Sequence, residues 1–201
     1  MNALPILQAV RLKGRVSRPD LSITTGLDGS SVETAVAELI SAGHLTGDTR
    51  VRLTIAGREK LSAMLSAERS GIDSAVITEA YARFCDVNGA FKALVTEWQL
   101  KDGEPNDHTD ADYDTAILTR LFDVHDQVIP IIADVAAVMP RVQVYADKLC
   151  TALKKVQAGD TSWFTMPIAD SYHTVWFELH EELIGAAGLT REEEAQAGHA
   201  Q

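Results

Sequence analysis

Cysteine is scarce in this chain of 201 residues: the two that occur, Cys85 and Cys150, lie far apart in the sequence. Neither belongs to a C-x-x-C pair, which is the spacing typical of zinc sites and of redox-active dithiols. We therefore predict two separate buried thiols, and neither a zinc site nor a redox centre.

Long hydrophobic runs are missing as well. No apolar stretch approaches the roughly 18 residues that a helix needs to cross a bilayer. The N-terminal segment MNALPILQAVRLKGR places its charged residues after the apolar ones, which is opposite to the order in a signal peptide. The chain is therefore expected to be soluble, cytoplasmic and without membrane contact. Its 46% hydrophobic content suits two modest hydrophobic cores.

Recognisable catalytic patterns are also lacking. The sequence shows no nucleophile beside a base, no phosphate-binding loop and no H-E-x-x-H pair of metal ligands. The oxygen-rich segment from Asn106 to Asp114 lacks the central glycine and the terminal glutamate of a calcium-binding loop. We therefore predict that the chain is not an enzyme and needs neither a cofactor nor a metal ion.

Positive charge is sparse outside the first third of the chain. Residues 71–201 carry 9 Lys and Arg against 22 Asp and Glu, a net charge of −13, whereas residues 1–70 carry 9 against 7, a net charge of +2. Because an acidic body repels a polyanion, any contact with nucleic acid is expected in the first 70 residues. The alternative is that the acidity serves only to keep the protein in solution.

The residues from Asp28 to Ile55 predict an amphipathic helix followed by a strand. Ser30 and Glu33 have the spacing of a capping box, so the helix is expected to begin near Ser30. Gly43 suits a left-handed helix end. The predicted buried face of the helix consists of Val32, Ala35, Val36, Leu39 and Ile40, and the predicted half-buried strand alternates Val51, Leu53 and Ile55 with Arg50, Arg52 and Thr54.

Two further helices are predicted before this segment. The first ends near Lys13, where Gly14 stops it, and the second begins after Ser17 with Pro19 in its first turn. Gly47 and Asp48 are expected at the tip of a hairpin that leads into the strand. This order of helices, turn and hairpin is typical of a winged helix-turn-helix domain, here over residues 1–70.

The segment Thr54–Arg58 resembles the T-x-x-G-R sequence that closes the wing in MarR-type winged-helix regulators. The resemblance implies that the helix beginning at Ser30 enters the major groove of double-stranded DNA, while the wing approaches the backbone. The residues implied to face DNA are Ser30, Ser31, Thr34 and Ala37 on the helix, Thr49, Arg50 and Arg52 on the wing, and Arg15 and Arg18 as phosphate contacts.

The outer face of the same helix carries Glu33 and Glu38 but no Lys or Arg. Base readout most often uses arginine, and affinity for phosphates requires cations. Docking to a protein therefore stays open as the alternative to DNA binding.

Residues 71–190 predict an antiparallel helical bundle, because short connections make consecutive helices run in opposite directions. The predicted helices span residues 73–98, 113–139, 141–156 and 171–184, after a linker at 66–73. Pro130 is expected to end or bend the second of them. The predicted fold class is therefore mainly α, with a flexible polar tail at residues 191–201.

Five aromatic and histidine residues of this half are candidates to line a ligand-binding pocket: Trp98, His108, Trp163, His173 and Trp176. The alternatives are structural. Thr109 or Asp110 is suited to cap the next helix, and aromatic residues commonly fill the end of a bundle.

Three segments of this half are similar to the C-terminal region of some bacterial pyruvate phosphate dikinase-like and phosphoenolpyruvate-utilising proteins. They are TEWQL at 96–100, NDHTDADYD at 106–114 and AGDTSWFTMPIADSYHTVWFELHEEL at 158–183. The dikinase's phosphorylatable histidine and nucleotide-binding segments are absent from this chain, so the resemblance does not imply phosphotransfer. It implies a protein that acts near phosphoenolpyruvate or pyruvate metabolism, either by sensing a small acid or by docking to an enzyme of that metabolism.

Two functions follow from these patterns. The first is a DNA-binding, transcriptional regulator-like protein whose helical domain senses a ligand or forms a homodimer. The alternative is an accessory module that does not bind DNA and instead docks to a pyruvate phosphate dikinase-like enzyme.

Overall fold

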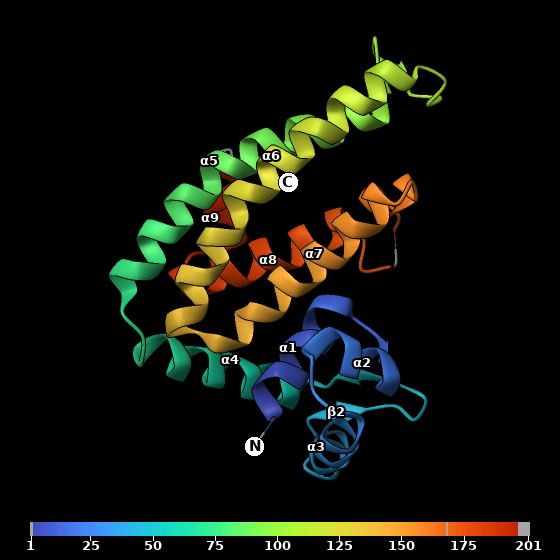
Figure 1. Ribbon diagram of the computed structural model, residues 1–201. Coiled ribbons are helices and arrows are strands. Elements are labelled where there is room, and N and C mark those ends of the chain that lie inside the picture. Colours follow the sequence, from blue (N-terminus) through green and yellow to red (C-terminus); the bar gives the residue numbers. More distant parts are fainter. Residues whose placement is uncertain (1, 168, 197–201) are drawn as a thin grey trace. The chain divides into compact units, whose positions relative to one another are not determined.

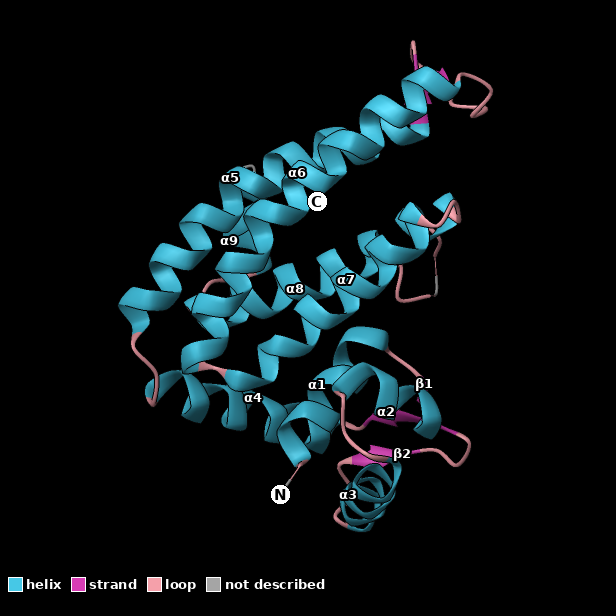
Figure 2. Ribbon diagram, in the orientation of Figure 1, coloured by secondary structure: helices cyan, strands magenta, loops and turns pink. Residues whose placement is uncertain are grey.

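The structure is a computed structural model that describes residues 2–167 and 169–196. It is mainly α, as the sequence predicts (Figure 2). The chain divides into two compact units: unit 1 ends at Ile72 and unit 2 begins at Asp73.

Unit 1 combines four helices with a small sheet among its described residues (Figure 1). Its elements are α1 (Ala3–Lys13), β1 (Val16–Ser17), α2 (Arg18–Thr25), α3 (Gly29–Ser41), β2 (Leu45–Thr46), β3 (Arg50–Leu53) and α4 (Ile55–Ser70). The sheet has the order β1-β3-β2, and both pairings are antiparallel. Val16 lies opposite Val51, and Leu45 opposite Leu53, so the same face of the sheet is apolar on all three strands.

The core of unit 1 is made of aliphatic side chains from every one of its elements. Helices α1, α2 and α3 pack against one another, and α1 also packs against β3 and α4. The buried members are Ile6, Leu7, Ala9, Val10, Val16, Leu21, Val32, Ala35, Val36, Leu39, Leu45, Val51, Leu53 and Leu61. Burial of this apolar surface is the main stabilising contribution to unit 1.

Helix starts in unit 1 are set by side-chain caps. The Ser17 hydroxyl accepts the backbone N–H of Asp20, as the sequence predicts for α2. Helix α3 differs from the prediction: it begins at Gly29, because the carboxylate of Asp28, and not Ser30, accepts the backbone N–H of Ser31 at 2.9 Å. Glu33 does not complete a capping box, since it pairs with Arg18.

The strand after the hairpin is shorter than predicted. Val51 and Leu53 are buried between the exposed Arg50 and Arg52, but the alternation stops there. Ile55 is the first residue of α4 and is 79% exposed, because the hydroxyl of Thr54 accepts the backbone N–H of Gly57 and starts a helix. The predicted linker is wrong in its first part, since α4 continues to Ser70.

Gly57 is held in close contact with the turn that follows α3. A Cβ atom at this position would lie 2.0 Å from the carbonyl oxygen of His44. That oxygen accepts the backbone N–H and the hydroxyl of Thr54, so its position is fixed. The glycine of the T-x-x-G-R segment is therefore required by packing within unit 1.

Unit 2 is a helical bundle whose described elements run from Ser74 to Gln196. They are α5 (Ser74–Gln99), β4 (Leu100–Lys101), β5 (Glu104–Pro105), α6 (Ala111–Val138), the 3-10 helix η1 (Pro140–Val142), α7 (Gln143–Gln157), the 3-10 helix η2 (Thr161–Phe164), α8 (Tyr172–Ala187) and α9 (Arg191–Gln196). The long helices α5 and α6 lie side by side (Figure 1). Helix α5 also packs against α8, α6 packs against α7, and α7 packs against α8.

Helix α6 continues through Pro130 to Val138, so of the two effects predicted for this proline, ending the helix is not the one observed. Two other features of unit 2 differ from the prediction. The segment between the predicted helices 73–98 and 113–139 contains a hairpin, in which Asp102 and Gly103, both with positive φ, form the two-residue turn between β4 and β5. Residues 191–196 of the predicted flexible tail form α9, and residues 197–201 lie outside the described residues.

Among the described residues, no helix is both long enough and apolar enough to span a membrane.

Candidate functional site

The outer face of α3 displays the residues predicted to face DNA. Ser30, Thr34 and Ala37 are exposed and Ser31 is half-buried, while the opposite face of the helix enters the core of unit 1. The hydroxyl of Thr34 donates to the carbonyl of Ser30 at 2.9 Å, which turns it toward its own helix.

The first turn of α3 concentrates oxygen atoms around Asp28. The hydroxyls of Ser30 and Ser31 both donate to its carboxylate, at 2.5 and 2.7 Å. Together with the backbone N–H of Ser31, these donors hold the pKa of Asp28 far below its usual range, so it is anionic at all ordinary pH values. This negative charge stabilises the positive end of α3.

The hairpin of unit 1 contributes exposed cations. Thr49, Arg50 and Arg52 are all exposed, and Arg50 donates to the carbonyl oxygen of Arg15 at 3.5 Å. Arg50 lies opposite Ser17 in the sheet, and Arg15 is only two residues before Ser17. The exposed Arg15 therefore lies next to the hairpin. Arg18 is different, because it is half-buried and paired with Glu33 of α3.

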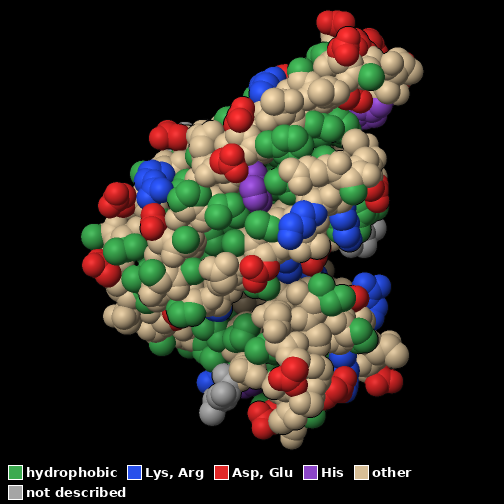
Figure 3. All heavy atoms as spheres, viewed as in Figure 1, with side chains coloured by type: hydrophobic (Ala, Val, Ile, Leu, Met, Phe, Trp, Pro, Cys, Tyr) green, Lys and Arg blue, Asp and Glu red, His purple; other side chains and the backbone are tan. Residues whose placement is uncertain are grey.

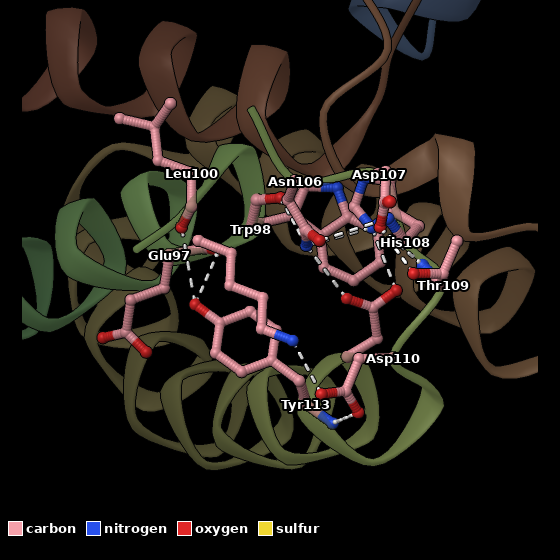
Figure 4. Close-up of polar contacts among 11 residues, drawn as sticks. Glu97, Trp98, Leu100, Asn106, Asp107, His108, Thr109, Asp110 and Tyr113 are labelled. Carbon is pink, nitrogen blue, oxygen red and sulfur yellow. Dashed lines mark hydrogen bonds and ion pairs between the residues drawn. The ribbon is translucent and has the colours of Figure 1, made fainter. Parts of the chain in front are cut away.

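In unit 2, the loop after β5 forms a polar cluster around His108 (Figure 4). The imidazole Nδ1 of His108 lies 2.9 Å from Asp114, and the side-chain amide of Asn106 donates to Asp114 at 3.0 Å. His108 has a φ of 56° and its ring lies against Trp98, with 4.3 Å between the ring centroids. Asp114 thus orients an exposed imidazole that rests on an indole.

Neighbouring contacts hold this loop to the end of α5. The Asp110 side chain caps α6 by accepting the backbone N–H of Tyr113. The sequence predicts this cap as the structural alternative to a ligand-binding role. Its other oxygen accepts Lys101 Nζ at 2.7 Å, and this ammonium lowers the pKa of Asp110. The Tyr113 hydroxyl donates to the carbonyl of Glu97, which connects α6 to α5 (Figure 4).

The five predicted pocket residues fall into three groups. Trp98 and His108 form a tilted ring contact, and Trp98 also contacts Phe164 of η2, with 5.3 Å between the ring centroids. Trp176 is buried in the bundle and His173 is half-buried; both rings contact Phe91. The Trp176 Nε1–H donates to the buried amide oxygen of Asn88 at 2.9 Å, which is the role of a core tryptophan. Trp163 lies under Lys155, whose Nζ is 3.1 Å from the ring centroid.

Two ion pairs that the sequence patterns did not predict join η1 and α7 to α8. Arg141 donates to Glu182 at 2.6 Å, and the Tyr145 hydroxyl donates to the other oxygen of the same carboxylate at 3.0 Å. Lys148 lies 3.4 Å from Glu178, and both side chains are buried. Burial raises the pKa of Tyr145, with a further contribution from Glu182, so Tyr145 is a neutral donor. Glu178 and Glu182 are four residues apart on α8, whereas Arg141 and Lys148 are seven residues apart, and this spacing is the only signal that the sequence offered.

A second group outside the sequence analysis joins Cys150 of α7, His125 of α6 and Tyr172 of α8. Cys150 Sγ lies 3.6 Å from His125 Nε2, and the Tyr172 hydroxyl lies 3.2 Å from His125 Nδ1. Burial lowers the pKa of His125, so its imidazole is neutral at pH 7. The three residues are 22 to 47 positions apart, and only the packing of α6, α7 and α8 brings them together.

A third group connects α9 to the bundle. The buried Tyr81 of α5 donates to Glu194 of α9, and its hydroxyl also lies 3.3 Å from His180 Nε2 of α8. Burial and the bond to Glu194 both raise the pKa of Tyr81 above its ordinary value. Within the described part of the chain, no group of three or more His, Cys, Asp and Glu side chains is arranged to hold a metal ion.

Comparison with known proteins gives no further information on the site. No family model, no curated protein and no solved structure matches the chain.

Proposed function

We propose that unit 1 is a winged helix-turn-helix domain that binds double-stranded DNA, and that unit 2 is its ligand-sensing or dimerisation domain. The order of elements supports this assignment: α1, β1, α2, α3 and then the hairpin β2-β3, with β1 added to the sheet beside β3. In domains of this kind the helix in the position of α3 enters the major groove. The resemblance of Thr54–Arg58 to the end of the wing in MarR-type regulators points the same way.

The observation that carries the proposal is the exposed surface of α3 together with the hairpin cations. The helix buries one apolar face and leaves Ser30, Thr34 and Ala37 exposed, which are small enough to approach base edges. Arg15, Arg50 and Arg52 are exposed, and no carboxylate of the described residues forms an ion pair with them. Cations of this kind are what phosphate contacts require.

The distribution of charge favours unit 1 over unit 2 as the part that contacts DNA. Acidic side chains are spread over the surface of unit 2 (Figure 3), and its net charge repels a polyanion. The candidate DNA contacts are accordingly confined to residues 15–52.

One observation favours a second function. The outer face of α3 carries Glu33 and Glu38 and no cation, and unit 1 exposes two large apolar side chains, Ile23 and Ile55. Acidic and apolar groups on a surface suit a protein partner better than DNA. The second candidate is therefore a docking module for a pyruvate phosphate dikinase-like enzyme, which the resemblance of residues 158–183 also suggests.

A salt titration of DNA binding separates the two candidates. For the full chain on random duplex DNA, log K is expected to fall linearly with log salt, with a slope of about −0.9 for each phosphate contact. The double variant Arg50→Gln/Arg52→Gln should make the slope less steep by about 1.8, because two contacts are lost. The control Arg120→Gln changes the charge of unit 2 and should leave the slope as it is. Absence of binding at low salt would exclude the DNA-binding function and favour docking.

The mass of the protein in solution tests the predicted homodimer. Dimeric helix-turn-helix proteins bind two half-sites that are about one helical turn apart. Light scattering is expected to give the mass of two chains, and a mass of one chain would exclude a palindromic operator.

A further inference from the structure

We propose that Cys150 is a nucleophilic thiol, activated by His125, that forms a covalent adduct with an uncharged α,β-unsaturated carbonyl compound. Neither the DNA-binding proposal nor the docking alternative requires this site, and its test involves no DNA. The proposal rests on the arrangement of Cys150, His125 and Tyr172 at the contact of three helices.

The geometry has the parts of an activated nucleophile. Cys150 Sγ and His125 Nε2 are 3.6 Å apart, which is within the range of a hydrogen bond to sulfur. On the other side of the ring, His125 Nδ1 lies 3.2 Å from the Tyr172 hydroxyl. A nucleophile next to a base, with a third group orienting the base, is the arrangement that activates serine and cysteine nucleophiles.

Burial fixes the protonation state of His125. It lowers the pKa of the ring, so the imidazole is neutral at pH 7, and Nε2 can accept the thiol proton as the bond from sulfur to carbon forms, when Nδ1 carries hydrogen. Tyr172 is fully buried, and burial raises its pKa, so its hydroxyl stays neutral and fixes the ring by hydrogen bonding to Nδ1. Cys150 itself is half-buried.

The reaction is an addition that needs no oxidant and has no leaving group. The thiol proton moves to His125 Nε2 as the Sγ electron pair forms a bond to the β-carbon of the unsaturated carbonyl compound. The carbon–carbon π pair moves to the α-carbon, which then takes the proton back from the imidazolium. The product is a thioether, and His125 returns to its neutral form.

The charge of unit 2 selects among electrophiles. Residues 73–201 carry the same 9 Lys and Arg and 22 Asp and Glu as residues 71–201, so the unit has a net charge of −13. This net charge disfavours anionic reagents, so the conjugated carbonyl compound that we propose is uncharged.

Competition between the two cysteines of one molecule provides the test. The full chain is treated with limiting N-ethylmaleimide, an uncharged conjugated carbonyl compound, and the adducts at Cys150 and Cys85 are counted by peptide mass spectrometry against time. Both thiols are half-buried, but burial raises the pKa of Cys85, and its neighbour is the Tyr81 hydroxyl instead of an imidazole. Cys150 is expected to react at least about tenfold faster, since general-base assistance contributes on the order of a hundredfold at optimised sites. Equal rates, or a faster Cys85, would overturn the proposal.

Two variants attribute the difference to the proposed residues. His125→Gln should lower the rate at Cys150 by about tenfold while the rate at Cys85 in the same molecule stays constant. Tyr172→Phe removes only the hydroxyl and should lower the rate at Cys150 by about threefold. In urea both cysteines should react equally in every variant. If His125→Gln unfolds the bundle, Cys85 will also react faster, and the rate at Cys150 in Tyr172→Phe then serves as the test. If a folded His125→Gln variant leaves the rate at Cys150 unchanged, the role of His125 is contradicted.

Discussion

The two units of the chain differ in what they bury. Unit 1 buries mainly aliphatic side chains, with Gln8 and Thr24 as its buried polar residues, and its pair of Arg18 with Glu33 is partly exposed. Unit 2 buries Lys148, Glu178 and Glu182, together with histidine and asparagine side chains. A small domain is thus built from apolar burial and local capping, whereas the larger bundle adds paired polar groups.

This difference affects how each unit specifies its structure. An aliphatic core tolerates repacking, so unit 1 depends on its caps and on the close contact at Gly57 to fix its turns. In unit 2, each buried charge has a partner on a neighbouring helix, and a shift of one helix along another would separate these partners. The most informative substitutions therefore remove one member of a buried ion pair in unit 2 and add a Cβ atom at the close contact in unit 1.

The largest effect is expected from Glu182→Ala in unit 2. The substitution removes the carboxylate that faces Arg141 and the Tyr145 hydroxyl, and breaking a buried pair costs about 3–5 kcal/mol of unfolding free energy. Urea unfolding followed by circular dichroism measures the change. The control is Glu97→Ala, which breaks an exposed pair with Arg120 and should cost no more than about 1 kcal/mol. Similar costs for both would show that burial of the ion pairs contributes little.

The next largest effect is expected from Gly57→Ala in unit 1. A methyl group there would overlap the carbonyl oxygen of His44, and relieving the overlap should cost about 1–3 kcal/mol. The control is Gly29→Ala, where an added Cβ meets no atom within 4 Å. Thermal unfolding of both variants gives the comparison. If Gly57→Ala is as stable as Gly29→Ala, the contact between α4 and the turn after α3 is not fixed.

A smaller effect of opposite sign is expected from Gly89→Ala in unit 2. Gly89 lies inside α5, and an added Cβ would be in open space. Replacing glycine by alanine within a helix should raise the unfolding free energy by about 0.5–1 kcal/mol. Chemical denaturation measures the increase, and a decrease would mean that α5 needs glycine at this position.

The smallest effect concerns pH. The pKa of His125 is lower in the folded protein than in the unfolded chain, so the unfolded chain binds more protons as the pH falls through about 6.5, the ordinary histidine value. The stability contributed by neutral His125 is present above that pH and is lost below it. Unfolding midpoints measured between about pH 7.5 and 5.5 should fall with pH, and less steeply in His125→Gln. Equal slopes in both proteins would show that His125 titrates alike in the folded and unfolded states.

Sequence patterns predicted the helices well where the signals were local. Ser17 with Pro19, Gly14 and Gly43 are recognisable signals, and the structure places helix ends at each of them. Competition between nearby signals explains the errors. Asp28 takes the cap that Ser30 was expected to provide, and Thr54 starts α4 before Ile55 can extend the strand. The Asp102-Gly103 turn was readable from the sequence, because this pair favours a hairpin.

The polar sites of unit 2 could not be predicted in the same way. The contact of His108 with Trp98 brings together residues ten positions apart across a hairpin, and Cys150 lies next to His125 through the packing of two helices. Contacts of this kind depend on which face each helix turns toward its neighbour. A single sequence gives the periodicity of each helix but not the pairing of helices. In contrast, the exposure of Ser30, Thr34, Arg50 and Arg52 follows from periodicity alone.

The burial of Glu194 in α9 has a practical consequence for anyone producing this protein. If composition were the only guide, the polar C-terminal residues would be removed from a recombinant version. A chain cut at Leu189 would lose the carboxylate that accepts the Tyr81 hydroxyl in the interior of the bundle. Recombinant versions should therefore retain residues 190–196, and an affinity tag is better separated from α9 by a spacer than fused directly to Gln196.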